Sequence, residues 1–198
     1  MSGAEAVGIM LGFLLIYIVL IGISIASYVM TSYSFYTIAK RRNIKNPWLA
    51  WIPIASNWTV GCIANDYDAK NGYNRKWQNV LLSLAIIFYA GFFIMYAIMI
   101  ASIVSMAFRY GSVEAAELEI LRSIIPTYIM MIFALIVGFG WEFCYAICVY
   151  KIFESTVPEK ALKYILLYLM VPLAGPICLM KCKDKGYPVP QVFENYQE

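Results

Sequence analysis

One carboxylate lies inside a long apolar stretch of this 198-residue chain. Glu142 precedes Lys151 by nine residues, which is about 13 Å along a helix. A charge at that depth is costly, so such residues face the interior of a helical bundle and are functional candidates. No Lys or Arg lies within a long apolar stretch to pair with it, so Glu142 is expected to be neutral. It could form a proton or cation site, or donate one structural hydrogen bond between helices.

Ser56 and Asn57 are a second group of candidate binding residues. They follow Pro53 in the middle of a short apolar segment, Pro47–Ala64. Proline interrupts regular backbone hydrogen bonding, so the two side chains could bind a polar group or an ion at the broken backbone. They could equally satisfy the backbone groups that Pro53 leaves unpaired.

Two neighbouring acids have the chemistry of a catalytic or metal-binding pair. Asp66 and Asp68 could do acid–base work or hold a divalent ion. They lie in the sequence NDYDAKNG, which is rich in turn-forming residues and predicts a solvated loop.

The thiols also have a pattern that could bind a metal. Two C-x-x-x-C pairs, Cys144/Cys148 and Cys178/Cys182, each place both sulfurs on one helical face, an arrangement that could hold Cu(I) or zinc. Cysteine is also a common small apolar residue within membrane spans, which is the simpler interpretation. The chain has no histidine and no recognisable catalytic motif, so we expect no enzyme activity, metal or cofactor.

The composition indicates whether the chain is soluble or embedded in a membrane. Hydrophobic residues make up 62% of the chain and charged residues 14%, with a mean hydropathy of +0.70. Soluble domains have roughly 45–50% apolar and about 25% charged residues, so this is a membrane protein. We expect one transmembrane domain over residues 1–186 and a polar tail over 187–198. The net charge of +3 gives no argument for nucleic acid.

Three apolar runs are long enough to cross a bilayer, which takes about 20 helical residues. They are Val7–Ala39, Trp77–Phe108 and Ile124–Tyr150. Two shorter apolar segments, Pro47–Ala64 and Lys163–Met180, are broken by proline. The predicted fold is therefore an all-α integral membrane helical bundle with three long transmembrane helices and two short re-entrant or interfacial segments. A four-span bundle, in which the last segment crosses, is the alternative.

The distribution of Lys and Arg predicts the orientation. If neither short segment crosses, thirteen basic residues lie on one side and two on the other, so the positive-inside rule places the N-terminus outside and the C-terminus in the cytoplasm. Basic and aromatic residues cluster where they would contact lipid headgroups at the membrane surface. These expected interface residues are Lys40, Arg41, Arg42, Lys45, Trp48, Trp51 and Trp77.

The link between the second and third runs has a pattern of its own. The sequence VEAAELEILR has helical spacing and predicts a surface helix. Pro126 is then expected in the first turn of the third span, where proline is tolerated.

The two short segments resemble each other. Each follows a helix that ends in Tyr-x-Ile, at Tyr36–Ile38 and Tyr150–Ile152, and each contains a hydrophobic-Pro sequence, IPIAS or VPLAG. This similarity suggests two parallel repeats. Re-entrant segments usually line a cavity or a pathway.

The residues IAKRRNIKNPWLAWIPIASNWTVGCIAND resemble a group of small, uncharacterised bacterial membrane proteins. The shared features are a basic turn, a Trp-Leu-Ala-Trp-Ile-Pro core and a polar residue soon after, and the resemblance covers Tyr36–Lys76. It implies a bacterial polytopic protein in the cell membrane, and it assigns no catalytic residue.

Three functions are compatible with these features. The first is a non-catalytic accessory or assembly subunit of a larger membrane complex, because neither chemistry nor a soluble domain is evident. The second is a small transporter or channel that self-associates and uses Glu142 as a buried proton or cation site. The third is an intramembrane enzyme acting on lipid, against which the lack of histidine and of a nucleophile–base pair argues. The expected partners are the lipid bilayer and other membrane-protein subunits or further copies of the chain.

Overall fold

The computed structural model describes residues 3–109, 113–171 and 173–185. This part of the chain is helical and contains no strand. Its three longest helices are α1 (Gly3–Arg41), α3 (Trp77–Arg109) and α4 (Val113–Thr156). All three are long and apolar enough to cross a membrane, which confirms the predicted all-α architecture with three long spans.

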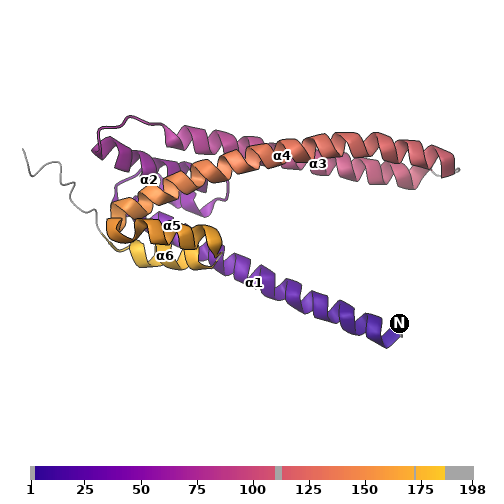
Figure 1. The fold of residues 1–198 in the computed structure, drawn as a ribbon, viewed down its shortest axis with the longest axis horizontal. Coiled ribbons are helices and arrows are strands. Elements are labelled where there is room, and N and C mark those ends of the chain that lie inside the picture. The colour runs from indigo at the N-terminus through magenta and orange to yellow at the C-terminus, as the bar shows by residue number, and fades with distance from the viewer. Residues whose placement is uncertain (1–2, 110–112, 172, 186–198) are drawn as a thin grey trace, which may run out of the picture.

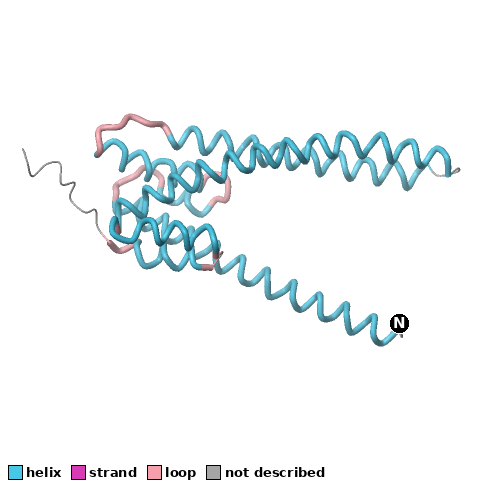
Figure 2. The backbone as a smooth tube through the Cα atoms, in the orientation of Figure 1, coloured by secondary structure: helices cyan, strands magenta, loops and turns pink. Residues whose placement is uncertain are grey.

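Five short helices gather at one end of the molecule, which we call the head (Figures 1 and 2). They are the 3-10 helices η1 (Pro47–Trp51) and η2 (Pro158–Lys160) and the α-helices α2 (Ser56–Lys70), α5 (Ala161–Met170) and α6 (Ala174–Cys182). The C-terminal end of α1, the N-terminal end of α3 and the C-terminal end of α4 also belong to the head (Figure 1). The buried core lies here, where all these helices meet.

The first short segment is a hairpin that leaves the end of the head and returns to it. Its turn reaches more than three helical turns back along α1, where the Tyr28 hydroxyl donates a hydrogen bond to the Trp51 carbonyl. Helix α2 then runs back, so that its last turns lie beside Arg42, whose guanidinium donates to the Ile63 carbonyl over 3.3 Å. The segment therefore does not continue across the molecule.

The second short segment does the same. Helix α5 leaves the end of α4, and α6 returns antiparallel to it (Figure 1). The chain after α6 comes back to the end of α1, where Arg41 donates to the Lys183 carbonyl over 3.4 Å. The alternative in which Lys163–Met180 forms a fourth span is therefore wrong. The polar tail, 187–198, lies outside the described residues.

The two hairpins occupy equivalent places. Helix α1 packs on its own η1 and on α6 of the other hairpin, while α4 packs on its own α5 and on α2 of the first hairpin. Both turns have an extended residue before a proline, Ile52 (φ −98°, ψ 121°) and Val171 (φ −130°, ψ 108°), as the proline ring requires. The predicted parallel repeat therefore has a structural counterpart.

The repeat is also visible in burial. The alignment that superposes Tyr36 on Tyr150 pairs Phe35 with Val149, Ile38 with Ile152 and Ala39 with Phe153, and all six of these residues are buried. The same face of each helix therefore packs into the head.

Local backbone chemistry sets the ends of α1 and α2. After α1, Asn43 adopts a left-handed conformation (φ 54°) and the Ile44 amide donates back to the Ala39 carbonyl. After α2, Gly72 (φ 79°) does the same, and the Tyr73 amide donates to the Asp68 carbonyl. Both are Schellman-type helix ends, which favour Asn or Gly at the left-handed position.

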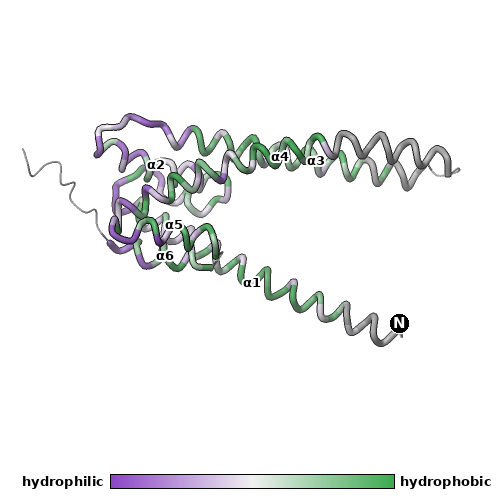
Figure 3. The backbone as a smooth tube through the Cα atoms, viewed as in Figure 1, coloured by the Kyte–Doolittle hydropathy of each residue, from purple (hydrophilic) through white to green (hydrophobic). Residues whose placement is uncertain are grey.

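The first half of α1 has no packing partner within the described chain. Its large apolar residues from Met10 to Ile25 are exposed, and α1 packs on neither α3 nor α4. Figures 1 and 3 show this hydrophobic helix diverging from the α3–α4 pair, with hydrophilic residues concentrated at the far end of the head.

The link before the third span differs from the prediction. Helix α4 runs without a break from Val113 to Thr156, so the expected surface helix is the first part of the span helix. Pro126 consequently lies in the helix interior and not in its first turn.

Cysteine accessibility tests this topology. Cysteines that replace the exposed residues Tyr73 and Lys185 should react with an impermeant maleimide from the same side of sealed vesicles. A cysteine at Gly8, near the opposite end of α1, should react from the other side. The wild-type chain, in which Cys148, Cys178 and Cys182 are buried, gives the background. Labelling of Lys185→Cys and Tyr73→Cys from opposite sides would contradict the second hairpin.

Candidate functional site

A pocket of about 270 Å³ lies where the hairpin turns meet the long helices. The C-terminal half of α1 contributes Tyr28, Thr31, Ser32 and Phe35. The other walls come from the first hairpin turn and α2, and from α3, α4 and α5. Both repeats therefore contribute to this pocket, as expected for re-entrant segments.

The first hairpin supplies Pro53, Ser56 and Asn57. The Ser56 hydroxyl donates to the Pro53 carbonyl over 2.8 Å. The Asn57 amide nitrogen donates to the carbonyls of Pro53 (3.3 Å) and Ile54 (3.1 Å). Both side chains thus satisfy the broken backbone, which is the structural one of the two roles that the sequence left open.

Asn57 also connects the hairpin to α4. Its side-chain oxygen accepts a hydrogen bond of 2.9 Å from the Trp141 indole nitrogen, and Asn57 itself is only 2% exposed. The amide therefore fixes the orientation of the indole, and Asn57 acts as a positioning residue in the pocket wall.

Glu142 lines the same pocket. The structure therefore brings together all three predicted binding residues, Glu142, Asn57 and Ser56. Within the described residues no group donates a hydrogen bond to the Glu142 carboxylate or forms an ion pair with it, and the residue remains exposed. The expectation that Glu142 faces a closed bundle interior is thus only partly met, since the carboxylate lies at an open pocket.

Aromatic rings form the wall around Glu142. The ring centroids of Trp141 and Tyr145 are 5.9 Å apart, those of Tyr145 and Tyr168 are 6.5 Å apart, and those of Tyr89 and Trp141 are 6.5 Å apart. These four rings come from α3, α4 and α5 and form a continuous series. None of the residues that line the pocket is Lys or Arg, and Glu142 is the only carboxylate among them.

A second polar cluster lies deeper in the head. Asp68 is 3% exposed and accepts hydrogen bonds from the Lys151 ammonium over 2.6 Å and from the Trp77 indole over 2.8 Å. The Lys151 nitrogen also lies 4.9 Å from the centroid of the Trp77 ring. The predicted solvated loop is wrong here, because α2 continues through Asp68 and buries its carboxylate against α3 and α4.

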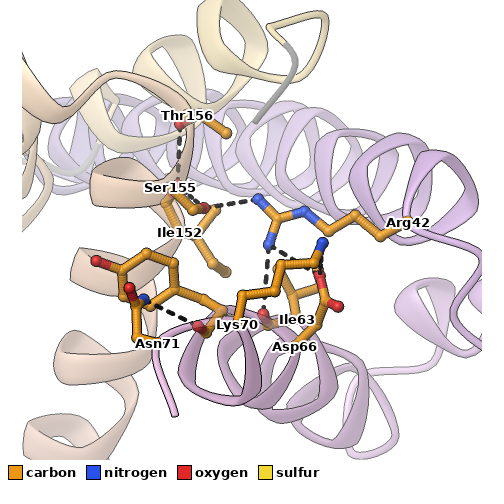
Figure 4. Close-up of polar contacts among 9 residues, drawn as sticks. Arg42, Ile63, Asp66, Lys70, Asn71, Ile152, Ser155 and Thr156 are labelled. Atoms are coloured by element: carbon orange, nitrogen blue, oxygen red, sulfur yellow. Dashed lines mark hydrogen bonds and ion pairs between the residues drawn. The ribbon is translucent and has the colours of Figure 1, made fainter. Parts of the chain in front are cut away.

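Arg42 forms the third cluster, at the junction of α1, α2 and α4 (Figure 4). Its guanidinium donates to the Ser155 hydroxyl over 2.6 Å and lies 3.8 Å from the Asp66 carboxylate. Lys70 pairs with the same carboxylate at 3.3 Å. The Arg42 side chain is only 6% exposed, so it holds the head together instead of facing lipid headgroups.

The other expected interface residues divide into two groups. The residues that remain exposed are Lys40, Arg41, Lys45, Trp48 and Trp51. Trp51 lies at the hairpin turn, beside Tyr28, and therefore far from the basic end of the head. Trp77 is half-buried in the Asp68 cluster.

Tyr67 lies near the end of α2, outside the three long spans. Burial, together with the nearby Glu154 carboxylate, raises the pKa of Tyr67 to about 12. The hydroxyl therefore remains neutral at physiological pH and can act only as a hydrogen-bonding group.

The cysteines have a packing role. Cys148, Cys178 and Cys182 belong to the buried core of the head. The described residues contain no group of three or more His, Cys, Asp or Glu side chains that could hold a metal ion.

No protein-family model, curated protein or solved structure matches the chain.

Proposed function

We propose that this chain is a small cation-translocating membrane protein, a transporter or channel, in which Glu142 is the cation-binding group. One observation carries the proposal: a carboxylate without a hydrogen-bond donor from the described chain lies in a pocket that two proline-broken hairpins help to form. Broken elements at a repeat interface are where transporters bind ions and substrates. A carboxylate in an apolar span is costly to retain unless it has such a role.

The orientation belongs to the same proposal. The basic residues of the head would lie in the cytoplasm of a bacterial cell and the N-terminus outside, as the positive-inside rule favours. The pocket then lies at the boundary between the basic head and the long apolar part of the spans, where a cation could enter from the cytoplasmic side.

Charge movement in reconstituted vesicles tests the transport role. We expect a current driven by gradients of protons, sodium, potassium or tetramethylammonium, and we expect Glu142→Gln to reduce it at least tenfold. The amide keeps the shape of the side chain and removes its charge, so the thermal unfolding of the variant should match that of the wild type. Glu159→Gln, the same change on an exposed residue of η2, should leave the current unchanged.

Equal currents for the wild type and Glu142→Gln would contradict this role. So would a current that is absent from the wild type in vesicles in which the protein is shown to be folded and inserted.

The exposed half of α1 favours a second candidate function. A helix without a neighbour in its own chain is suited to pack against another membrane protein, as an accessory subunit does. Native mass spectrometry after extraction in a mild detergent would show this directly. A stoichiometric partner would support the subunit role, whereas a homo-oligomer without a partner would support transport by self-associated copies.

A further inference from the structure

The walls of the pocket are unusual for a site that holds a metal ion or a strongly hydrated ion. Hard cations such as Ca²⁺ take six to eight oxygen ligands, but the only carboxylate that lines this pocket is Glu142. Two further oxygens are already engaged, since Asn57 accepts from Trp141 and Ser56 donates to a backbone carbonyl. The remaining oxygens of the lining belong to neutral hydroxyls, those of Thr31, Ser32 and the tyrosines, whereas hard cations are held mainly by carboxylates and carbonyls.

Aromatic side chains make up much of the pocket wall. Trp141 and Tyr145 lie one turn apart on α4, on either side of Glu142 in the sequence, with ring centroids 5.9 Å apart. Tyr168 of α5 and Tyr89 of α3 extend this surface on its two sides. Phe88 stacks on one face of the Trp141 ring, with centroids 5.7 Å apart, so a cation would meet the other face of Trp141 or the ring of Tyr145. Ring faces attract cations by their negative potential, and quaternary ammonium groups are recognised by aromatic cages.

We propose that the pocket binds a small organic ammonium cation, with Glu142 as its counter-ion and the rings of Trp141 and Tyr145 as its aromatic surface. This inference rests on the proposed function, whose cation site it specifies. The proposal takes Glu142 as ionised, in contrast to the neutral state expected from the sequence, and no Lys or Arg lines the pocket to compensate its charge. An alkylammonium group is weakly hydrated, so the pocket can bind it without supplying a shell of oxygen ligands.

The size of the pocket limits the ligand. Pockets for drug-sized molecules measure roughly 300–1,000 Å³, and this one measures about 270 Å³. It therefore accommodates a group as small as tetramethylammonium or choline. The same chemistry could come from a soluble amine or from the headgroup of a zwitterionic lipid, because the pocket is open and Glu142 is exposed.

Calorimetric titration of the purified full-length chain with tetramethylammonium chloride tests the inference, with sodium chloride at equal ionic strength as the reference. We expect saturable binding of tetramethylammonium alone. Glu142→Gln should weaken it at least about tenfold, or about 1.4 kcal/mol. Tyr145→Leu, which removes a ring face, should weaken it about three- to tenfold.

Two matched variants separate a binding role from a structural one. Tyr145→Phe keeps the ring and should bind within about twofold of the wild type. Glu159→Gln changes an exposed carboxylate outside the pocket and should have no effect. Absence of saturable binding to the wild type, or equal binding by Glu142→Gln, would overturn the inference.

The lipid environment distinguishes the two sources of the ligand. In nanodiscs of phosphatidylcholine a headgroup ligand would compete and raise the apparent Kd above its value in phosphatidylglycerol, whereas equal values would indicate a soluble amine. Either result retains an ammonium ligand.

The experiments can contradict the proposed transport role and the proposed ligand class independently of each other. Tetramethylammonium binding without a Glu142-dependent current would remove transport and keep the ligand. A current of protons or sodium without tetramethylammonium binding would remove the ammonium ligand and keep the transport role.

Discussion

Replacement of Asp68 by Asn is expected to destabilise the protein by about 3–5 kcal/mol, the usual cost of removing one partner of a buried ion pair. Asp68 is 3% exposed, and the Lys151 side chain that it pairs with is 12% exposed. The substitution leaves the ammonium of Lys151 in a poorly solvated site without its counter-ion. It also weakens the acceptor for the Trp77 indole. Thermal or detergent-induced unfolding of the purified chain measures the effect.

The surface pair between Arg41 and Asp184 supplies the matched control. These groups are 3.9 Å apart, and their side chains are 50% and 66% exposed. Pairs of this kind contribute about 0–1 kcal/mol, so Asp184→Asn should change the unfolding transition very little. If Asp68→Asn were as mild as Asp184→Asn, the head would not depend on the buried pair.

A double variant distinguishes lost attraction from uncompensated charge. Combining Asp68→Leu with Lys151→Met removes both charges and leaves apolar groups of similar volume. Such replacements are often neutral or stabilising, so the double variant should be clearly more stable than Asp68→Asn. The hydrogen bond from Trp77 is weakened in Asp68→Asn and lost in the double variant, so a more stable double variant would report on the uncompensated charge of Lys151.

The three spans, both hairpins and the three pocket residues were predictable because each depends on local pattern. The lengths of the apolar runs predict the spans, and proline within a short apolar segment predicts a break. Glu142 and Asn57 were identified as polar residues within apolar segments, without any knowledge of contacts. The excess of Lys and Arg in the head also predicted that the last segment would return.

The role of Asp68 was not predictable in the same way. Its neighbours are turn formers, and the turn at Asn71–Gly72 does exist, but α2 reaches further than the composition indicates. The partner that buries Asp68 is Lys151, 83 residues later in the chain. Local spacing cannot show such a long-range pair. The role of Arg42 was not predictable for the same reason, because its contact with Ser155 joins residues 113 positions apart.

Only part of the aromatic wall of the pocket could be predicted from the sequence. Trp141 and Tyr145 are four residues apart and therefore share a helical face, and Glu142 lies three residues before Tyr145. Tyr168 and Tyr28 join them through the packing of α5 and α1, which the sequence of α4 does not encode. In a chain with 16 tyrosines, interface residues and pocket residues look alike until the helices are placed.

Gly61→Ala is expected to have an effect at least as large as that of Asp68→Asn. Helix α2 approaches α3 so closely that a Cβ at Gly61 would lie 2.4 Å from the Cα of Gln78 and 2.5 Å from its backbone nitrogen. Both contacts are with backbone, so no side-chain rotation can relieve them, and the two helices must separate. Overpacking of a core costs about 1–3 kcal/mol where side chains can adjust, and we expect more here.

The direction of this effect is informative because helix propensity acts the other way. Alanine is favoured over glycine within a helix by about 1 kcal/mol, so α2 alone would gain from the change. A net loss of stability would therefore report on the contact between α2 and α3. Gly22→Ala in α1, where an added Cβ meets nothing within 4 Å, is the control and should be neutral or slightly stabilising.

Separation of α2 from α3 should also change the shape of the pocket. Helix α2 begins with Ser56 and Asn57, and Asn57 orients the indole of Trp141. Gly61→Ala should therefore weaken tetramethylammonium binding under conditions in which the remaining folded protein can still be titrated, whereas Gly22→Ala should not. Unchanged stability in Gly61→Ala would mean that α2 and α3 do not approach as closely as the packing of the head requires. The pocket depends on this approach and would then have a different shape.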